Sequence, residues 1–189
     1  MNKPFAPDML VSAAPAIGPA RFTADEFLRM GELGAFENMK VELSHGELIR
    51  MTPPHDPHGA MQAQIIVKLH AATGDSIGLR GEVAVRLNDD TVRGFDAGLI
   101  EPEAGTKALT PDQVHLAVEV SDTTIDQDLG SKARDYSEGG IRLVWVVDVN
   151  ARVTHVMSEP GPEGYARREV VRFGEPLALP DGRGAITLD

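Results

Sequence analysis

The chain has 189 residues, of which 42% are hydrophobic, and it carries a formal net charge of -11 with no cysteine. This length suits one domain with its own core, and the lack of cysteine excludes disulfides, thiolate metal sites and thiol nucleophiles. The negative charge argues against a protein that grips nucleic acid with its whole surface, because such binding depends on neutralising phosphates.

Residues 1–20 contain four prolines among small residues, a composition typical of a flexible tail. We therefore expect a single folded domain over residues 21–189. The sequence has neither an apolar run of about 18 residues nor the pattern of a signal peptide. These features predict a cytoplasmic protein with no membrane association.

The first elements are a short helix and a hairpin. Thr23 followed by Glu26 forms a capping-box pattern and predicts a helix over Ala24–Met30. Apolar alternation in 41–43 and 48–51, on either side of a glycine-bearing turn, predicts two antiparallel strands. Glu42 alternates with core residues of the first strand, so its side chain points the opposite way.

A proline-rich break separates the hairpin from a long helix, for which apolar residues at helical spacing predict His58–Ala72. Three strands should follow, over Val83–Leu87, Phe95–Ile100 and Val114–Val120. The run of residues after the long helix is therefore mostly β.

A polar helix over Asp126–Gly139 is expected next, ending at a glycine pair. Leu143–Val147 is apolar throughout, as in a central strand covered on both faces, and Val153–Met157 should pair with it. Glu169–Phe173 and Ala185–Leu188 show weaker strand patterns. The order predicts an α/β (α+β) fold with a mixed central β-sheet flanked by helices.

Two acids interrupt apolar strands in this pattern. Asp96 lies within Gly94–Ile100, and Glu119 lies within Leu116–Val120. A buried carboxylate is costly unless it is paired or bound to a metal. With Lys132 close by, two such acids on neighbouring strands favour a divalent-cation site for cleaving phosphodiesters, although edge-strand acids facing water would give the same pattern.

Short motifs follow one another in a distinctive order and spacing between residues 22 and 173: Val41–Leu48, Met51–Pro54, His58, Phe95–Ala97, Val118–Asp122, Asp128, Lys132, Tyr136, Gly140–Ile141 and Val144–Asp148. In this order they resemble the Uma-type putative restriction endonuclease family of the PD-(D/E)XK nuclease superfamily. The resemblance implies a restriction-endonuclease-like core and a metal site at Asp96 and Glu119. It also implies an endonuclease that hydrolyses DNA with Mg²⁺ or Mn²⁺.

The carbonyl oxygen of Val120 would complete a set of oxygen ligands with Asp96 and Glu119, as hard divalent cations prefer. The superfamily has a lysine two residues after the second acid, where this chain has Ser121. The resemblance assigns that role to Lys132 on the following helix. Tyr136, four residues later, would face Glu119 from the same side.

Each of these assignments has a simpler alternative. Lys132 would also suit a surface ion pair with Asp128, and Tyr136 an ordinary core position. Glu42 matches an acid of the family's first strand and would bind the metal directly or through water, whereas an exposed hairpin glutamate is the common case.

His55, Asp56 and His58 lie close together, but their proline-broken spacing disfavours one shared ion, so capping or solvated histidines are the default. His58 would still reach a phosphate in the cleft. A local basic strip on an acidic exterior was expected from six residues: Arg80, Arg86, Arg93, Lys107, Lys132 and Arg134.

Two functions stay open at this point. The first is a metal-dependent endonuclease acting on DNA. The second is a catalytically inactive nuclease-like fold that serves as a binding or dimerisation module, favoured by the acidic charge and the missing strand lysine. A homodimer through exposed C-terminal strands suits either function.

Overall fold

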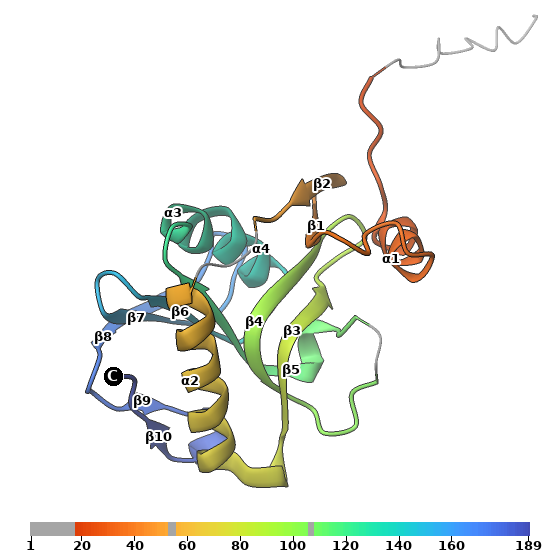
Figure 1. Ribbon diagram of the computed structural model, residues 1–189. Coiled ribbons are helices and arrows are strands. Elements are labelled where there is room, and N and C mark those ends of the chain that lie inside the picture. The colour runs from red at the N-terminus through yellow and green to blue at the C-terminus, as the bar shows by residue number, and fades with distance from the viewer. Residues whose placement is uncertain (1–17, 53–55, 106–107) are drawn as a thin grey trace, which may run out of the picture.

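The computed structural model describes residues 18–52, 56–105 and 108–189, so most of the predicted tail lies outside the described residues. A mixed eight-stranded sheet carries helices on both faces, which confirms the predicted fold class (Figure 1). The α-helices are α1 (Ala24–Glu32), α2 (Asp56–Thr73), α3 (Ile125–Gln127) and α4 (Ala133–Glu138). Three short 3-10 helices cover Gly74–Ser76, Pro111–Gln113 and Pro180–Gly182, and a π-helix covers Asp128–Lys132.

The strands of the large sheet are β1 (Val41–Ser44), β2 (Glu47–Arg50), β3 (Gly78–Arg86), β4 (Val92–Ile100), β5 (Val114–Ser121), β6 (Leu143–Asp148), β7 (Val153–Ser158) and β8 (Arg167–Arg172). A small second sheet consists of β9 (Leu177–Ala178) and β10 (Ala185–Ile186). None of the helices described here is long and apolar enough to cross a membrane.

The sheet has the order β2-β1-β4-β5-β6-β7-β8, with β3 also paired to β4. Because β3 pairs along the whole of β4, β1 and β5 must share the opposite edge of that strand. β1 meets β4 at Val92, and the β5 ladder ends at Ala97, which pairs with Val118. A gap therefore lies between β1 and β5, and residues 93–96 of β4 form its edge. We call this gap the notch.

The two faces of the sheet are covered by different elements. Met61, Ile65 and Leu69 of α2 pack on one face, together with apolar residues of β9 and β10. Ala133 and Tyr136 of α4 pack on the other face. β6 lies in the middle of the sheet with Trp145 fully buried, which confirms it as a central strand covered on both sides.

The segment predicted as one helix over Asp126–Gly139 is divided. α3 leads into the π-helix and then into α4, and these elements connect the parallel strands β5 and β6. A π turn takes in more residues than an α turn and changes the direction of the side chains that follow it. Asp128 and Lys132, at the two ends of the π-helix, are both buried.

The predicted C-terminal strands are exposed only in part. β8 is an edge strand with Val170 on its surface. The segment Ala185–Leu188 instead pairs with β9, and its Ile186 and Leu188 are buried in the core cluster beneath α2. Only β8 therefore remains as a C-terminal edge for the homodimer, which stays a prediction.

The lack of a side chain at Gly98 of β4 lets two neighbouring groups approach closely. A Cβ there would lie 2.6 Å from the Leu116 carbonyl oxygen and 2.5 Å from a ring carbon of Phe95. We expect Gly98→Ala to lower the free energy of unfolding by about 2 kcal/mol. In thermal denaturation this corresponds to a melting temperature lower by roughly 4–8 °C. Gly94→Ala, on the same strand, is the control, because its Cβ would have 3.6 Å to its nearest neighbour. Equal losses in the two variants would contradict the close approach at Gly98.

Candidate active site

The notch gathers the buried charge of the molecule. Throughout residues 18–52, 56–105 and 108–189, seven charged side chains are buried: Glu42, Arg93, Asp96, Glu119, Asp128, Lys132 and Asp135. They come from three strands, the π-helix and α4, and all lie at or beside the notch. Five carboxyl groups face two bases there, which leaves an excess of negative charge in a region that water hardly reaches.

Asp96 occupies the position where the β4–β5 ladder stops. Its Oδ2 accepts a hydrogen bond of 2.8 Å from the Val120 backbone N–H, so the carboxylate takes the place of a ladder carbonyl. Its Oδ1 lies 3.4 Å from Lys40 Nζ and 3.5 Å from His58 Nε2. Burial alone would raise the pKa of Asp96, but His58, the Val120 N–H and two lysines lower it to about 2. Asp96 is therefore an anion at neutral pH.

Glu119 contacts both side chains that were predicted to face it, Lys132 and Tyr136. Its Oε1 lies 2.9 Å from Lys132 Nζ and accepts a 2.5 Å hydrogen bond from the Tyr136 hydroxyl. Among the described residues, none donates a hydrogen bond to its Oε2. Burial raises the pKa of Glu119, and the nearby carboxylates reinforce this effect against the opposing charge of Lys132.

The alternative pairing of Lys132 with Asp128 on the surface is wrong. Lys132 is 3% exposed, and it forms ion pairs with Glu119 and Glu42. Asp128 is buried as well and accepts a 2.6 Å hydrogen bond from the Thr124 hydroxyl. Burial tends to lower the pKa of Lys132, but the carboxylates around it raise the pKa above its usual value, so Lys132 stays protonated.

Glu42 is not the exposed hairpin residue of the simpler alternative, since it is 2% exposed. Its Oε1 lies 3.2 Å from Lys132 Nζ and accepts a 3.0 Å bond from the Gly94 N–H. Its Oε2 accepts a 3.0 Å bond from Arg93 Nη1. β1 thus brings Glu42 to the notch from the side opposite Glu119.

Arg93 and Asp135 were not recognised from the sequence as part of this cluster. Arg93 Nε donates to Asp135 Oδ2 at 2.7 Å, and both side chains are buried. The one available signal was a charged residue within the apolar β4, three positions before Asp96. That signal does not identify Asp135, 42 residues later in the sequence, as the partner of Arg93.

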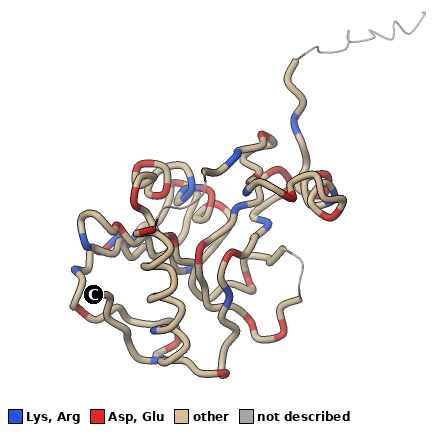
Figure 2. Tube along the Cα trace, in the orientation of Figure 1, with Lys and Arg blue, Asp and Glu red and all other residues tan. Residues whose placement is uncertain are grey.

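The five described residues of the expected basic strip do not form one exposed strip, and of these five Arg134 is exposed on α4. Arg93 and Lys132 are buried in ion pairs, Arg86 pairs with Asp25 and Asp89, and Arg80 donates to backbone carbonyls of residues 104 and 105. Lys107 lies outside the described residues. Lysines and arginines are instead scattered over several elements, as Figure 2 shows.

A narrow cavity of about 60 Å³ opens beside Asp96. Its lining includes Lys40, His58, Asp96, Val120, Asp128 and Lys132. This volume holds a few water molecules. A wider apolar pocket of about 600 Å³ lies between α2 and the start of β3, but none of the buried charged residues lines it. The chemistry of the molecule therefore lies at the smaller cavity.

The donors at the notch fit a hard divalent cation. Within the described part of the chain, no three or more His, Cys, Asp and Glu side chains are grouped so that they could hold a metal ion. A cation would therefore depend on Asp96 and Glu119, helped by a backbone oxygen and water, which is the partly hydrated coordination that Mg²⁺ favours. Asp96, whose pKa is low, supplies negative charge of the kind that such an ion requires.

Three comparisons place the chain among known proteins. A family model described as "Uma2: Putative restriction endonuclease" matches residues 24–189. The fold is similar to the crystal structure of a putative nuclease belonging to DUF820 from Anabaena variabilis, with a TM-score of 0.63 and 16% sequence identity. That match covers 84% of this chain and 88% of the other. No curated protein matches.

Proposed function

Because the chain belongs to the Uma2 family of putative restriction endonucleases, we propose that it is a metal-dependent endonuclease that hydrolyses phosphodiester bonds in DNA. The supporting observation is the cluster of buried carboxyl groups at the notch, where Asp96 and Lys132 line one cavity and Glu119 contacts that lysine. A phosphodiester nuclease needs a site for a divalent cation and a positive group beside the reacting phosphate.

Asp96, Glu119 and the Val120 carbonyl are the proposed ligands of Mg²⁺ or Mn²⁺. When bound, such an ion lowers the pKa of a coordinated water and offsets the negative charge that grows on the phosphate oxygens. Asp96 is suited to this role because its low pKa keeps it ionised. The Val120 N–H holds its Oδ2, so the carboxylate is already oriented before a ligand arrives.

Lys132 is the proposed donor to the reacting phosphate. Its ammonium forms ion pairs with Glu119 and Glu42, and Lys132 is also one of the residues that line the cavity. An ammonium has three N–H groups, so it can contact a group in the cavity as well as these two carboxylates. Since the carboxylates raise the pKa of Lys132, it would act as a hydrogen-bond donor and a fixed positive charge, and not as a base.

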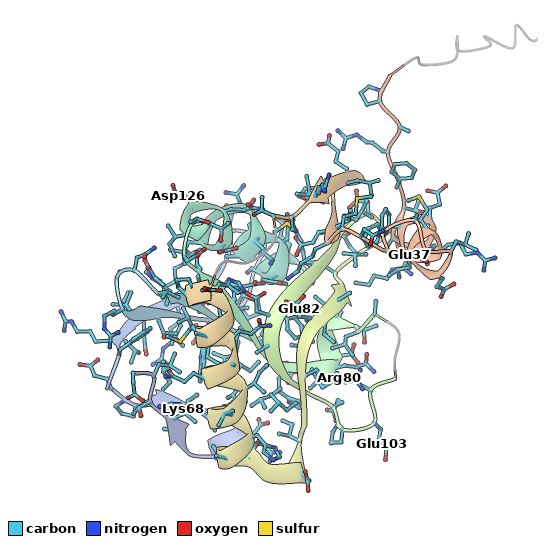
Figure 3. All side chains as sticks on the ribbon, in the orientation of Figure 1. Glu37, Lys68, Arg80, Glu82, Glu103 and Asp126 are labelled. Atoms are coloured by element: carbon cyan, nitrogen blue, oxygen red, sulfur yellow. The ribbon has the colours of Figure 1, made fainter. Side chains whose placement is uncertain are left out.

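His58 and Lys40 would bind a phosphate at the cavity mouth. Both line the cavity, and both lie near Asp96 Oδ1. The contact with Asp96 raises the pKa of His58, so a larger share of this imidazole is positive near neutral pH. Lys40 also contacts Glu82 of β3 at 3.2 Å, and Figure 3 labels that glutamate. Two local positive groups would let a phosphate approach despite the net charge of -11.

The direct test is to incubate the purified protein with supercoiled plasmid in Mg²⁺ or Mn²⁺ and to follow nicked and linear products. We expect cleavage with either ion and none with EDTA. Thermal denaturation with each ion supplies a second measurement, because a ligand bound by the folded state raises the melting temperature. A protein that neither cleaves plasmid nor gains stability from millimolar metal would favour the inactive binding module.

A further inference from the structure

We propose that Glu42, Arg93 and Asp135 form a positioning chain that aims the Lys132 ammonium into the cavity, and that Glu42 is not a metal ligand. The catalytic role of this positioning chain rests on the proposed function. The contacts on which it depends are present in the structure and do not require that function.

Both oxygens of Glu42 are already engaged. Oε1 faces Lys132 Nζ and the Gly94 N–H, and Oε2 accepts from Arg93 Nη1. Burial alone would raise the pKa of Glu42, but Lys132, the Gly94 N–H and Arg93 lower it. Coordinating a cation through Glu42 would require breaking bonds that now keep two buried bases paired.

Arg93 fixes Glu42 from the other side. Its guanidinium is a rigid, planar set of donors. Nε and Nη2 lie 2.7 and 2.5 Å from Asp135 Oδ2, while Nη1 reaches Glu42 and Nη2 reaches the Ser44 hydroxyl at 2.9 Å. Strands β1 and β4 and helix α4 are thereby joined at one side chain. Glu42 cannot shift unless all three elements move.

Asp135 ends the chain near the surface. Its Oδ1 lies 3.2 Å from Nε2 of His45, a residue with 58% of its side chain exposed. Asp135 follows Lys132 by three residues on the same helical segment, so the chain returns to the element that carries the lysine. Alternating charges thus run from Asp135 through Arg93 and Glu42 to Lys132.

The geometry of an ammonium explains why this chain matters. One acceptor leaves the group free to rotate about that hydrogen bond. Two acceptors, Glu119 and Glu42, fix both the position of Nζ and the direction of its third N–H. Removing Glu42 would leave Lys132 charged but without a fixed direction. Accuracy of this kind governs how well a donor stabilises a transition state.

The first experiment measures the accessibility of Lys132 and needs no catalysis. The full-length protein is treated briefly with acetic anhydride, and the acetylation of Lys132 is measured by mass spectrometry against Lys68 in the same molecule. Lys68 lies on α2, outside the notch, and is labelled in Figure 3. Because local opening controls the access to a buried amine, we expect Glu42→Gln to raise the ratio about tenfold. Asp135→Asn, which is further from Lys132, should raise it about threefold.

Glu47→Gln is the matched control. It makes the same chemical change on β2 of the same hairpin, where Glu47 forms an exposed ion pair with Arg21. Its acetylation ratio should equal that of the wild type. Melting temperatures show whether each variant is folded, and Asp135→Asn keeps the test decisive if Glu42→Gln does not fold. If folded Glu42→Gln and Asp135→Asn proteins give the same acetylation ratio as Glu47→Gln, the proposal is overturned.

Cleavage and metal binding supply the second readout. We expect Glu42→Gln to lower kcat about 10- to 100-fold with little change in KM, and to retain stabilisation by Mn²⁺. Complete loss of that stabilisation would make Glu42 a ligand and overturn the inference. If the wild type shows no metal-dependent cleavage, the proposed function fails, while the acetylation ratios still decide whether the chain holds Lys132.

Discussion

Asp96→Asn is expected to abolish plasmid cleavage, lowering kcat at least about 10³-fold at any Mg²⁺ concentration, because the substitution removes the charge that would hold the cation. Asparagine has nearly the same shape, and its side-chain oxygen can still accept the Val120 N–H. The fold should therefore survive. The measurements are nicking kinetics over a metal titration and melting temperatures with and without Mn²⁺.

The control for Asp96→Asn is Asp89→Asn. Asp89 lies in the turn before β4, fully exposed, and pairs with Arg86 on the surface. A surface pair of this kind contributes little to stability. Asp89→Asn should cleave like the wild type and keep its stabilisation by Mn²⁺. Cleavage by Asp96→Asn at more than about a tenth of the wild-type rate would exclude this carboxylate as a metal ligand.

Much of the fold follows from local patterns. The capping box at Thr23 and Glu26 is present, and helix α1 begins at Ala24 as predicted. The alternation in 41–51 gives the hairpin β1–β2. These elements are predictable because their hydrogen bonds join residues that are close in the sequence. Asp96 and Glu119 stand out for a related reason, since each is an acidic residue in a mostly apolar strand.

The rest of the site depends on contacts that local patterns do not encode. Glu42 and Arg93 are 51 residues apart, and Arg93 and Asp135 are 42 apart. Their pairing arises only when β1 and α4 meet at the notch. The π-helix was also not predicted, because Asp128 to Lys132 read as ordinary helix and the wide turn places both residues inside. Strand β9 was not predicted, because it contains two residues, too few for a periodic signal, whereas the weak pattern at Ala185–Leu188 includes β10.

The net negative charge of the protein is compatible with a DNA substrate, because the charged groups at the cavity differ from those elsewhere on the molecule. A bound divalent cation would offset negative charge among the buried groups, where five carboxyl groups accompany two basic groups. Lys40 and His58 stand at the mouth of the same cavity. Acidic groups elsewhere, such as Asp126 on α3 in Figure 3, would repel DNA that approaches away from the notch. Binding should therefore be weak without metal and centred on the cavity.

Lys132→Met is the second substitution with a large expected effect. Loss of the ammonium removes the donor aimed at the reacting phosphate, and we expect kcat to fall about 10²- to 10³-fold. Stabilisation by Mn²⁺ should remain, because Asp96 and Glu119 are unchanged. The variant also leaves Glu42 and Glu119 without their shared cation, which costs about 3–5 kcal/mol of folding free energy. Kinetics should therefore be measured well below its melting temperature.

Lys132→Arg separates charge from geometry. Arginine keeps the positive charge, but its planar fork cannot place three N–H groups as a compact ammonium does between Glu42 and Glu119. We expect it to recover stability relative to Lys132→Met and to recover little of kcat. Lys68→Met is the control, since Lys68 on α2 binds the exposed Asp189 and should leave cleavage unchanged. If Lys132→Met cleaves as fast as Lys68→Met, the Lys132 ammonium has no part in the reaction. The acidic side chains at the notch must then act with the cation alone.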